Sequence, residues 1–513
     1  MSAPPCARPP GAAAPLRDLW IDVEDLFEYA VHQSRPSGIQ RLSFEIYRAM
    51  VAQGAPMPRF CRHDRFGRTM REVRWDAVEQ IFARLTSRHP PSPDAPPPAP
   101  AALPTFDPAP PRRRFAWMRG HGSRLPPEIR FPLWDAIQAQ RASLHAASRV
   151  LRAVGAAWRP PQRAPAMAAA DTAEAAERPE PPAMEGTDLG KTAGPDDVLL
   201  ALGSPWSRTD YAEVVGGLQR ETGLRFGLLV YDLIPLLRPE FCDQSLVRLF
   251  AAWYGSVLPL ADRVFTISRA TADDVARFAV RRGFALRSPP QPVPIGTGFP
   301  ATAEDEAPGA LPAGLQPGGY ALAVSTIEAR KNHVLLFRTW RHLLETRPAH
   351  TVPKLVFAGR VGWLVADLMQ QIANANHLDG HLVVVPEPSD AELAALYRGC
   401  AFTLFPSLYE GWGLPITESL GFGKPCLAAD RTSMPEAGGA LARYADPENV
   451  GAWVEAVGRL IDDPADLAAW QARIRRDFAP VPWSATAAAL REGLGPAERA
   501  ATPARPSPTP AVP

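Results

Sequence analysis

The 513-residue sequence is long enough for two or three domains, and its 55 Lys and Arg almost balance its 54 Asp and Glu, which gives no reason to expect a nucleic-acid partner. Its five cysteines are scattered without a CxxC pair, which is typical of reduced thiols in a cytosolic protein and argues against a disulfide framework or a zinc site. The first 15 residues lack the apolar core of a signal peptide, and no apolar run approaches the roughly 20 residues that span a bilayer. We therefore expect a cytoplasmic protein that is soluble or lies on a membrane surface.

Proline is concentrated in stretches that cannot form a packed core. Eleven of the 22 residues from Pro90 to Pro111 are proline, a composition that favours extended polyproline II chain. We predict disorder in four segments, at 1–16, 90–111, 159–195 and 496–513. Between the two internal insertions, arginines recur on a helical pattern. They indicate either a solvated helix face, which we favour, or a peripheral contact with anionic lipid.

The first ordered half of the chain alternates strands, loops and helices as a Rossmann-like unit does. A strand at 19–23 is followed by a loop containing Gly38 and by an amphipathic helix at 42–51. Further strands are expected at 197–202, in the apolar run 226–235, and at 261–268. Asp232 lies at the carboxyl end of the second of these strands, where open α/β sheets bind ligands. The alternative is that Asp232 only caps the next helix.

The second half alternates more regularly, which predicts a mostly parallel sheet. Its strands are expected at 320–326, 354–359, 381–385, 401–405 and 425–429. The basic pair Arg330 and Lys331 follows the first of these strands, close to a helix start. Arginine offers a fork for phosphate oxygens and lysine a point charge, so the pair predicts a phosphate site, although an exposed basic pair at a helix start is often only solvated.

The most informative segment is FPSLYEGWGLPITESL at 405–420. Gly411 and Gly413 allow a sharp turn with a close backbone approach to a ligand, and a proline is placed to begin a helix. Strand, glycine turn and helix N-terminus together favour anions, because free amides and the helix dipole point at one spot. Glu410 and Glu418 flank this spot and would repel a phosphate. We therefore expect them to bind neutral hydroxyls of a sugar and a ribose at the two ends of a diphosphate.

The two glutamates within EGWGLPITES, followed by GFGKP, resemble the signature of the retaining family 4 glycosyltransferases. GIQR at 38–41, YDLIP at 231–235 and EARKN at 328–332 are similar to segments of a subset of that family. The resemblance implies an α/β fold of the GT-B type, in which two Rossmann-like, doubly wound parallel-sheet domains face each other across a cleft.

The resemblance also implies the domain boundaries, with the disordered Pro- and Ala-rich insertions inside the first domain. The N-terminal acceptor domain is expected at 17–300 and the nucleotide-sugar-binding domain at 317–480. A terminal helix at 481–495 is expected to cross back to the first domain.

Site roles follow from the resemblance in the same way. It implies that Glu410 contacts the transferred sugar, that Glu418 contacts the ribose, and that Arg330 and Lys331 stabilise the leaving diphosphate. The other expected donor-binding residues are Gly411, Gly413, Leu414, Thr326, Gly38 and Asp232. Two positions depart from the family pattern, because Thr326 stands where an arginine is usual and Tyr231 where many relatives have a histidine that contacts the sugar.

The function implied is sugar transfer with retention from a nucleotide sugar, without a metal or other cofactor, in the synthesis of a bacterial cell-surface polysaccharide. SPW, YDLIP and EARKN together resemble mannosyl- and rhamnosyl-type transferases, so GDP-mannose is the first expected donor, and a lipid-linked saccharide or polysaccharide the acceptor. The expected location is the cytoplasm, including the inner face of the cell membrane. Two alternatives stay open: a catalytically inactive nucleotide-sugar-binding partner of a polysaccharide assembly, and a sugar-nucleotide epimerase of the same fold.

Overall fold

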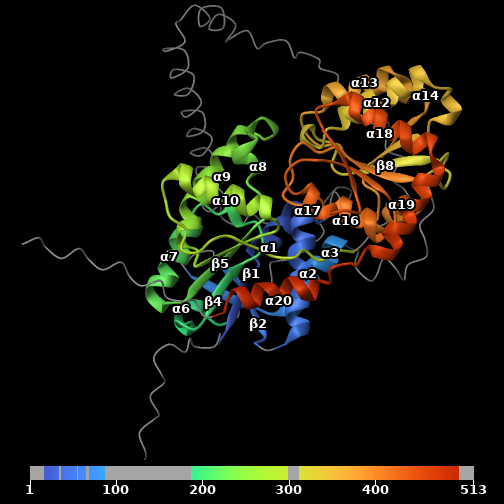
Figure 1. Ribbon diagram of the computed structural model, residues 1–513. Helices are drawn as coiled ribbons and strands as arrows, with labels where there is room; N and C mark the ends of the chain where they lie inside the picture. Colours follow the sequence, from blue (N-terminus) through green and yellow to red (C-terminus); the bar gives the residue numbers. More distant parts are fainter. Residues whose placement is uncertain are drawn as a thin grey trace, which may run out of the picture. The chain divides into compact units, whose positions relative to one another are not determined.

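The fold consists of two sheets with helices around them, a mostly parallel sheet in the first half of the chain and a parallel sheet in the second (Figure 1). The computed structural model describes residues 17–33, 36–54, 56–64, 69–86, 186–298 and 311–495, which belong to one compact unit. The predicted disordered segments at 1–16, 90–111 and 496–513 lie outside the described residues, and so does the basic stretch between the insertions.

The N-terminal sheet has seven strands in the order β3-β2-β1-β4-β5-β6-β7. They are β1 (Leu19–Asp22), β2 (Pro58–His63), β3 (Met70–Val73), β4 (Val198–Ala201), β5 (Arg225–Val230), β6 (Arg263–Thr266) and β7 (Gln291–Pro292). Only the edge strand β3 runs antiparallel to its neighbour. Successive side chains of β1 enter separate apolar clusters, Trp20 on one face and Ile21 on the other, so both faces of the sheet are covered.

The helices of this half are α1 (Glu24–His32), α2 (Gly38–Gln53), α3 (Trp75–Thr86), α6 (Leu189–Thr192), α7 (Tyr211–Thr222), α8 (Ile234–Leu237), α9 (Gln244–Val257) and α10 (Arg269–Arg282). The prediction of a loop at Gly38 is wrong. Ser37 caps α2 by accepting a hydrogen bond from the amide of Ile39, so Gly38 is the first residue of the helix. A further helix that we did not predict, α1, fills the connection between β1 and this cap.

The C-terminal sheet has six parallel strands in the order β10-β9-β8-β11-β12-β13. They are β8 (Tyr320–Val324), β9 (Lys354–Ala358), β10 (Leu382–Val385), β11 (Phe402–Phe405), β12 (Cys426–Ala429) and β13 (Arg443–Ala445). The strand order, counted from the first strand of the sheet, is 3-2-1-4-5-6, the doubly wound order of a Rossmann domain. The predicted α/β fold with two Rossmann-like parallel-sheet domains is therefore confirmed.

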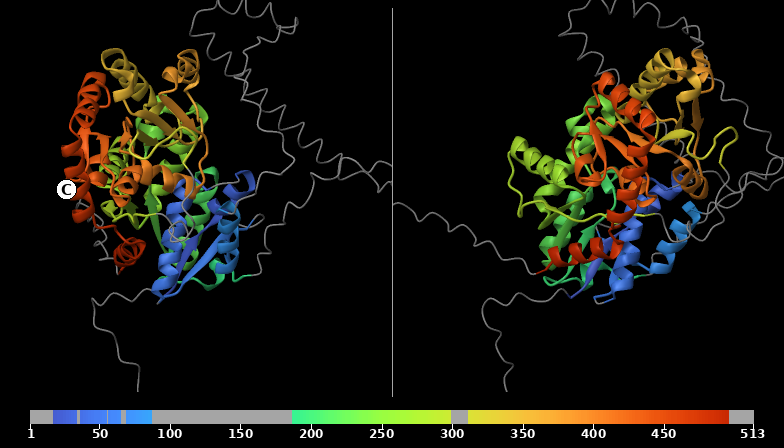
Figure 2. Two further views of the ribbon diagram at one scale, coloured as in Figure 1. Left: turned by 90° about the vertical axis from the view of Figure 1, so that its right-hand side faces the viewer. Right: turned by 45° about the vertical axis from the view of Figure 1, so that its right-hand side comes forward.

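The helices around this sheet are α12 (His333–Thr346), α13 (Ala366–Asn374), α14 (Asn376–Asp379), α15 (Asp390–Gly399), α16 (Leu414–Gly421), α17 (Met434–Gly438), α18 (Val450–Asp462) and α19 (Pro464–Asp477). The last helix, α20 (Trp483–Gly493), packs instead on the N-terminal domain, beside α2 (Figure 2, right). Its Leu490 belongs to the apolar cluster of that domain, and Arg491 donates to the carbonyl of Met50 at 3.0 Å. At α20 the chain thus returns to its first domain.

The end of the second insertion is part of the fold, which corrects its predicted boundary at Pro195. The amide of Glu72 in β3 donates to the carbonyl of Thr187 at 2.9 Å, and Arg71 forms a β-bridge with Asp188. The side chain of Asp188 then caps α6 by accepting from the amide of Gly190 at 3.0 Å. Composition favoured disorder here, but pairing with an edge strand orders residues 186–195.

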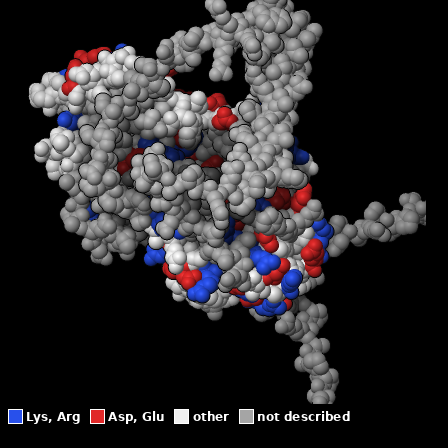
Figure 3. All heavy atoms as spheres, turned by 180° about the vertical axis from the view of Figure 1, so that it is seen from behind, with Lys and Arg blue, Asp and Glu red and all other residues white. Residues whose placement is uncertain are grey.

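Charges of both signs are interspersed on the described surface that Figure 3 shows, as the balanced composition predicts. Among the helices of the described residues, none is both long and apolar enough to cross a membrane.

Candidate active site

The candidate site lies where the adjacent strands β8 and β11 end. These strands pair in parallel, with Phe402 opposite Ala321, so the chain leaves both at the same edge of the sheet. The connections run in opposite directions from this pair, which makes it the topological switch point, where open α/β sheets bind ligands. The segment after β8 carries Arg330 and Lys331, and the segment after β11 carries Glu410.

Hydrogen bonds join these two segments. The amide of Leu408 donates to the carbonyl of Arg330 at 2.9 Å, and the Arg330 guanidinium donates to the carbonyl of Tyr409 at 2.6 Å. Asn332 has a left-handed backbone (φ 60°), which asparagine tolerates better than most residues. Its side-chain Nδ2 donates to the carbonyl of Pro406 at 3.2 Å. The basic segment and the glutamate segment therefore form one framework.

Glu410 lies between two cations. Its Oε1 is 2.5 Å from Lys331 Nζ, and its Oε2 is 2.9 Å from Arg330 Nη1. The hydroxyl of Ser407 donates to Oε1 at 2.6 Å, and Arg330 donates in addition to Glu328 at 2.6 Å. Only 9% of the Glu410 side chain is exposed, so these charges interact with little screening by water.

The two cations keep the carboxyl group of Glu410 ionised. Burial disfavours its charged form, but the charges of Arg330 and Lys331 outweigh burial and lower the pKa of Glu410 to about 2. Glu410 is thus ionised at neutral pH and is a poor general base. Together with Glu328, the cluster contains two carboxylates against two cations, so its formal charge is zero. A diphosphate would have to compete with Glu410 for both cations.

The glycine turn after Glu410 is shaped by the N-terminal domain. A Cβ atom on Gly411 would lie 2.2 Å from the carbonyl oxygen of Tyr231, closer than any packing contact allows. Gly413 has φ +121°, a conformation that other residues rarely adopt. We expected the turn to bring the backbone close to a ligand, but the near neighbour of Gly411 is protein backbone.

Glu418 occupies the second turn of α16, where its Oε2 accepts a hydrogen bond from the Tyr397 hydroxyl at 2.8 Å. Burial raises the pKa of Glu418, and this effect outweighs the opposing influence of the Tyr397 bond and of the Arg41 charge. The side chain faces a cavity of about 410 Å³, a size that suits a small-molecule ligand.

This cavity is lined by both domains and contains part of the predicted site. Its lining includes Gly38, Thr326, Leu414 and Glu418. The described residues that line it do not include the remaining predicted positions, Glu410, Arg330, Lys331, Asp232, Gly411 and Gly413. Across the cavity, Arg41 of α2 donates to both carboxylate oxygens of Asp390 in α15, at 3.0 and 2.8 Å, and so joins the two domains.

The predicted residues at the end of β5 have structural partners. Asp232 accepts a hydrogen bond from the amide of Ile234 at 3.0 Å, and the N-cap position of α8 is held by Leu233 and not by Asp232. Burial raises the pKa of Asp232, and the charge of Arg330 opposes this rise. The hydroxyl of Tyr231 donates to the carbonyl of Leu202 at 2.5 Å and so points into its own domain. The described residues that line the cavity do not include Tyr231.

Sequence reasoning missed several members of the site. Glu328 and Ser407 hold Arg330 and Glu410, and Asp390 pairs with Arg41. Glu328 carried a signal, since an acidic residue stands two positions before the basic pair. Asp390 carried none, because its partner lies 349 residues away in the sequence.

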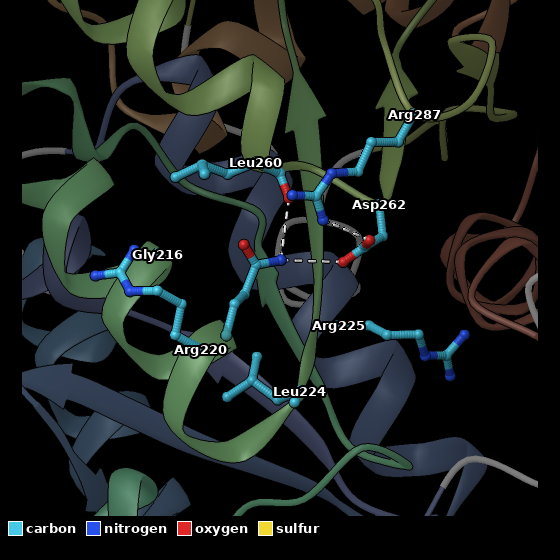
Figure 4. Close-up of a pocket in the computed structure, with 9 residues that line it drawn as sticks. Gly216, Arg220, Leu224, Arg225, Leu260, Asp262 and Arg287 are labelled. Atoms are coloured by element: carbon cyan, nitrogen blue, oxygen red, sulfur yellow. Dashed lines mark hydrogen bonds and ion pairs between the residues drawn. The ribbon is translucent and has the colours of Figure 1, made fainter. Parts of the chain in front are cut away.

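A second cavity, of about 370 Å³, lies in the N-terminal domain (Figure 4). Arg220, Arg225 and Arg287 line it, but their side chains point in different directions (Figure 4). Arg287 pairs with Asp262 at 2.8 Å, and Arg225 donates to the carbonyl of Leu494 at the end of α20. The arginines therefore do not converge on one ligand.

The described residues contain no group of three His, Cys, Asp or Glu side chains that could hold a metal ion.

The segment that contains the Glu410 cluster is similar to a known protein family. Residues 316–477 match the family described as glycosyl transferases group 1. The matched segment contains the sheet β8–β13, the Glu410 cluster and Glu418.

Two mannosyltransferases are similar to this chain over about a third of their own length. The serotype-specific mannosyltransferase WbdA of Escherichia coli is 27% identical over 259 residues, which cover 48% of this chain and 31% of that protein. The O-antigen chain mannosyltransferase B of Escherichia coli is 35% identical over 135 residues, 26% of this chain and 34% of that protein. The chain thus spans about a third of the length of these relatives. The crystal structure of Anabaena HepE in complex with UDP aligns with a TM-score of 0.43 and 16% identity, over 60% of this chain and 80% of that one.

Proposed function

We propose that the chain is a glycosyltransferase that moves a hexose from a nucleotide sugar to a saccharide acceptor, because residues 316–477 match the family described as glycosyl transferases group 1. The observation that carries the proposal is Glu410, an ionised carboxylate held between Arg330 and Lys331 at the switch point of the sheet. The segment after it leads to Leu414 and Glu418, which line a cavity of suitable size.

The cluster supplies the groups that this reaction needs. Breaking the bond between the sugar and the diphosphate places negative charge on the leaving group, which preorganised cations stabilise. In the proposed donor complex, Arg330 and Lys331 turn from Glu410 to the phosphate oxygens. The carboxylate of Glu410 is then free to accept hydrogen bonds from hydroxyls of the sugar, and Glu418 accepts from the ribose.

In this proposal the acceptor proton goes to the leaving group and not to Glu410, whose carboxylate accepts hydrogen bonds from hydroxyls of the sugar. The acceptor hydroxyl oxygen forms its bond to the anomeric carbon while the bond to the diphosphate breaks, and the proton passes to a leaving phosphate oxygen. We propose that this transfer retains the anomeric configuration and needs no metal.

Mannose is the proposed sugar and GDP-mannose the proposed donor, since both relatives described above are named as mannosyltransferases. The proposed acceptor is a lipid-linked saccharide or a growing surface polysaccharide, and the proposed place of action is the cytoplasmic face of the cell membrane. The proposal is tested by thermal shift and nucleoside diphosphate release with GDP-, UDP- and dTDP-sugars, without metal.

Stabilisation by one donor together with diphosphate release would support the proposal and identify the sugar class. Stabilisation without release, with lipid-linked acceptors present, would favour an inactive nucleotide-sugar-binding partner. If no nucleotide sugar stabilises the protein, the proposal fails.

A further inference from the structure

The charges around the 410 Å³ cavity are unusual for a site that receives a diphosphate. Its lining contains four carboxylates, which are Glu45, Glu387, Asp390 and Glu418. The same lining contains two cations, Arg41 and Arg360. Among the described lining residues the carboxylates thus outnumber the cations, so a diphosphate, with a charge of about −2 or more negative, needs a cation that can turn to it.

The cations near the cavity are already engaged, with one exception. Arg41 donates to both oxygens of Asp390. Arg330 and Lys331 do not line the cavity, and both are paired with Glu410. Arg360 is exposed, and within the described residues its guanidinium forms no hydrogen bond or ion pair.

Backbone hydrogen bonds hold Arg360 beside the segment that contains Thr326. Arg360 follows β9, and its carbonyl accepts a hydrogen bond from the amide of Ile327 at 2.8 Å. The amide of Gly362 donates back to the carbonyl of Ile327 at 2.8 Å, and a Cβ on Gly362 would lie 2.7 Å from the methyl of Thr326. The loop after β9 is therefore packed directly on the segment that contains Thr326.

The side chain of Arg360 is near the opposite wall of the cavity as well. Tyr29 of α1, in the N-terminal domain, also lines the cavity. Burial raises the pKa of Tyr29, and the positive charge of Arg360 is the largest influence that opposes this rise. The guanidinium is thus close enough to Tyr29 for its charge to act across the cavity.

We propose that Arg360, in the loop after β9, binds the diphosphate of the nucleotide sugar. This inference rests on the proposed function and adds to it a binding residue from the loop after β9. A planar guanidinium can donate two parallel hydrogen bonds to phosphate oxygens, and among the described residues Arg360 has no side-chain partner that it would first have to leave. Arg330 and Lys331 would contact the diphosphate only after their ion pairs with Glu410 have opened.

The test compares binding of GDP and guanosine to the full chain by titration calorimetry, with UDP and uridine in a parallel series. Arg360→Gln is expected to weaken binding of the diphosphate about 10- to 100-fold, the usual effect of removing a charged hydrogen bond, and to leave nucleoside binding unchanged. Arg360→Lys should retain part of the affinity, because it keeps the charge but not the fork. Arg338→Gln, an exposed arginine of α12, is the matched control and should bind both ligands as the wild type does.

The outcomes separate this inference from the function on which it rests. If the wild type binds neither GDP nor UDP, the proposed function fails and Arg360 has no such role. If the wild type binds a diphosphate and Arg360→Gln binds it equally well, only the Arg360 inference fails. Unchanged diphosphate binding with a raised KM for a lipid-linked acceptor would also overturn it, since Arg360 would then bind the acceptor phosphate.

Discussion

Replacing Glu410 by glutamine tests the central cluster, because it removes one negative charge and little volume. The pKa of Glu410 is lowered from 4.5 to about 2, and each unit is worth about 1.36 kcal/mol, so the folded surroundings favour the ionised carboxylate by about 3 kcal/mol. At pH 7 this stabilisation is fully present. Glu410→Gln should therefore lower the free energy of unfolding by up to about 3 kcal/mol, because Arg330 and Lys331 lose their shared partner.

The assay is denaturant or calorimetric unfolding of the full chain at pH 7 and at lower pH. Because the folded pKa is depressed, the contribution of Glu410 is lost as pH falls from about 4.5 towards 2, and the gap between wild type and variant should narrow in that window. Glu448→Gln, an exposed carboxylate of the same domain, serves as control and should unfold as the wild type does. A Glu410→Gln variant at least as stable as the wild type at pH 7 would refute the pairing argument. In turnover assays, the same variant should lose most of its activity.

Two further substitutions test the rest of the site. Glu418→Gln should weaken GDP binding about tenfold while turnover at saturating donor stays near that of the wild type. As pH is lowered, protonation of Glu418 should weaken GDP binding, and because burial raises the pKa of Glu418, this loss should begin at a higher pH than for a free glutamate. The same pH dependence of GDP affinity in Glu418→Gln would contradict this. Gly411→Ala should destabilise the protein by about 1–3 kcal/mol, because the new methyl meets the Tyr231 carbonyl, whereas Gly217→Ala in an open position of α7 should stabilise it by about 0.5–1 kcal/mol. A Gly411→Ala melting curve that matches the wild type would show that the two loops are not in firm contact.

Much of the sheet architecture could be predicted because parallel strands leave a simple pattern. Buried strands such as β11 read as short apolar runs, and the residues after them collect at one sheet edge. Arg330 and Lys331 follow one predicted strand and Glu410 follows another, the resemblance implied that they share a site, and the structure brings their side chains together.

What the sequence could not predict depends on contacts between distant parts of the chain. The hydroxyl direction of Tyr231 follows from the Leu202 carbonyl, and the need for glycine at 411 follows from a backbone atom of the other domain. The pairing of Arg330 and Lys331 with Glu410 was also missed, because their type and spacing suit a phosphate as well as a carboxylate. The roles of these residues in binding a donor stay predictions.

The ordered end of the second insertion has a consequence for how the chain can be shortened. Strand β3 is the outermost strand of its sheet, and its free backbone groups would offer a template for pairing with other chains. Residues 186–188 cover part of that edge, with Thr187 accepting from Glu72 and Asp188 bridging Arg71. A variant that removes the insertion up to residue 185 keeps this protection. One that continues to the predicted boundary at Pro195 would expose the edge and favour aggregation without touching the active site.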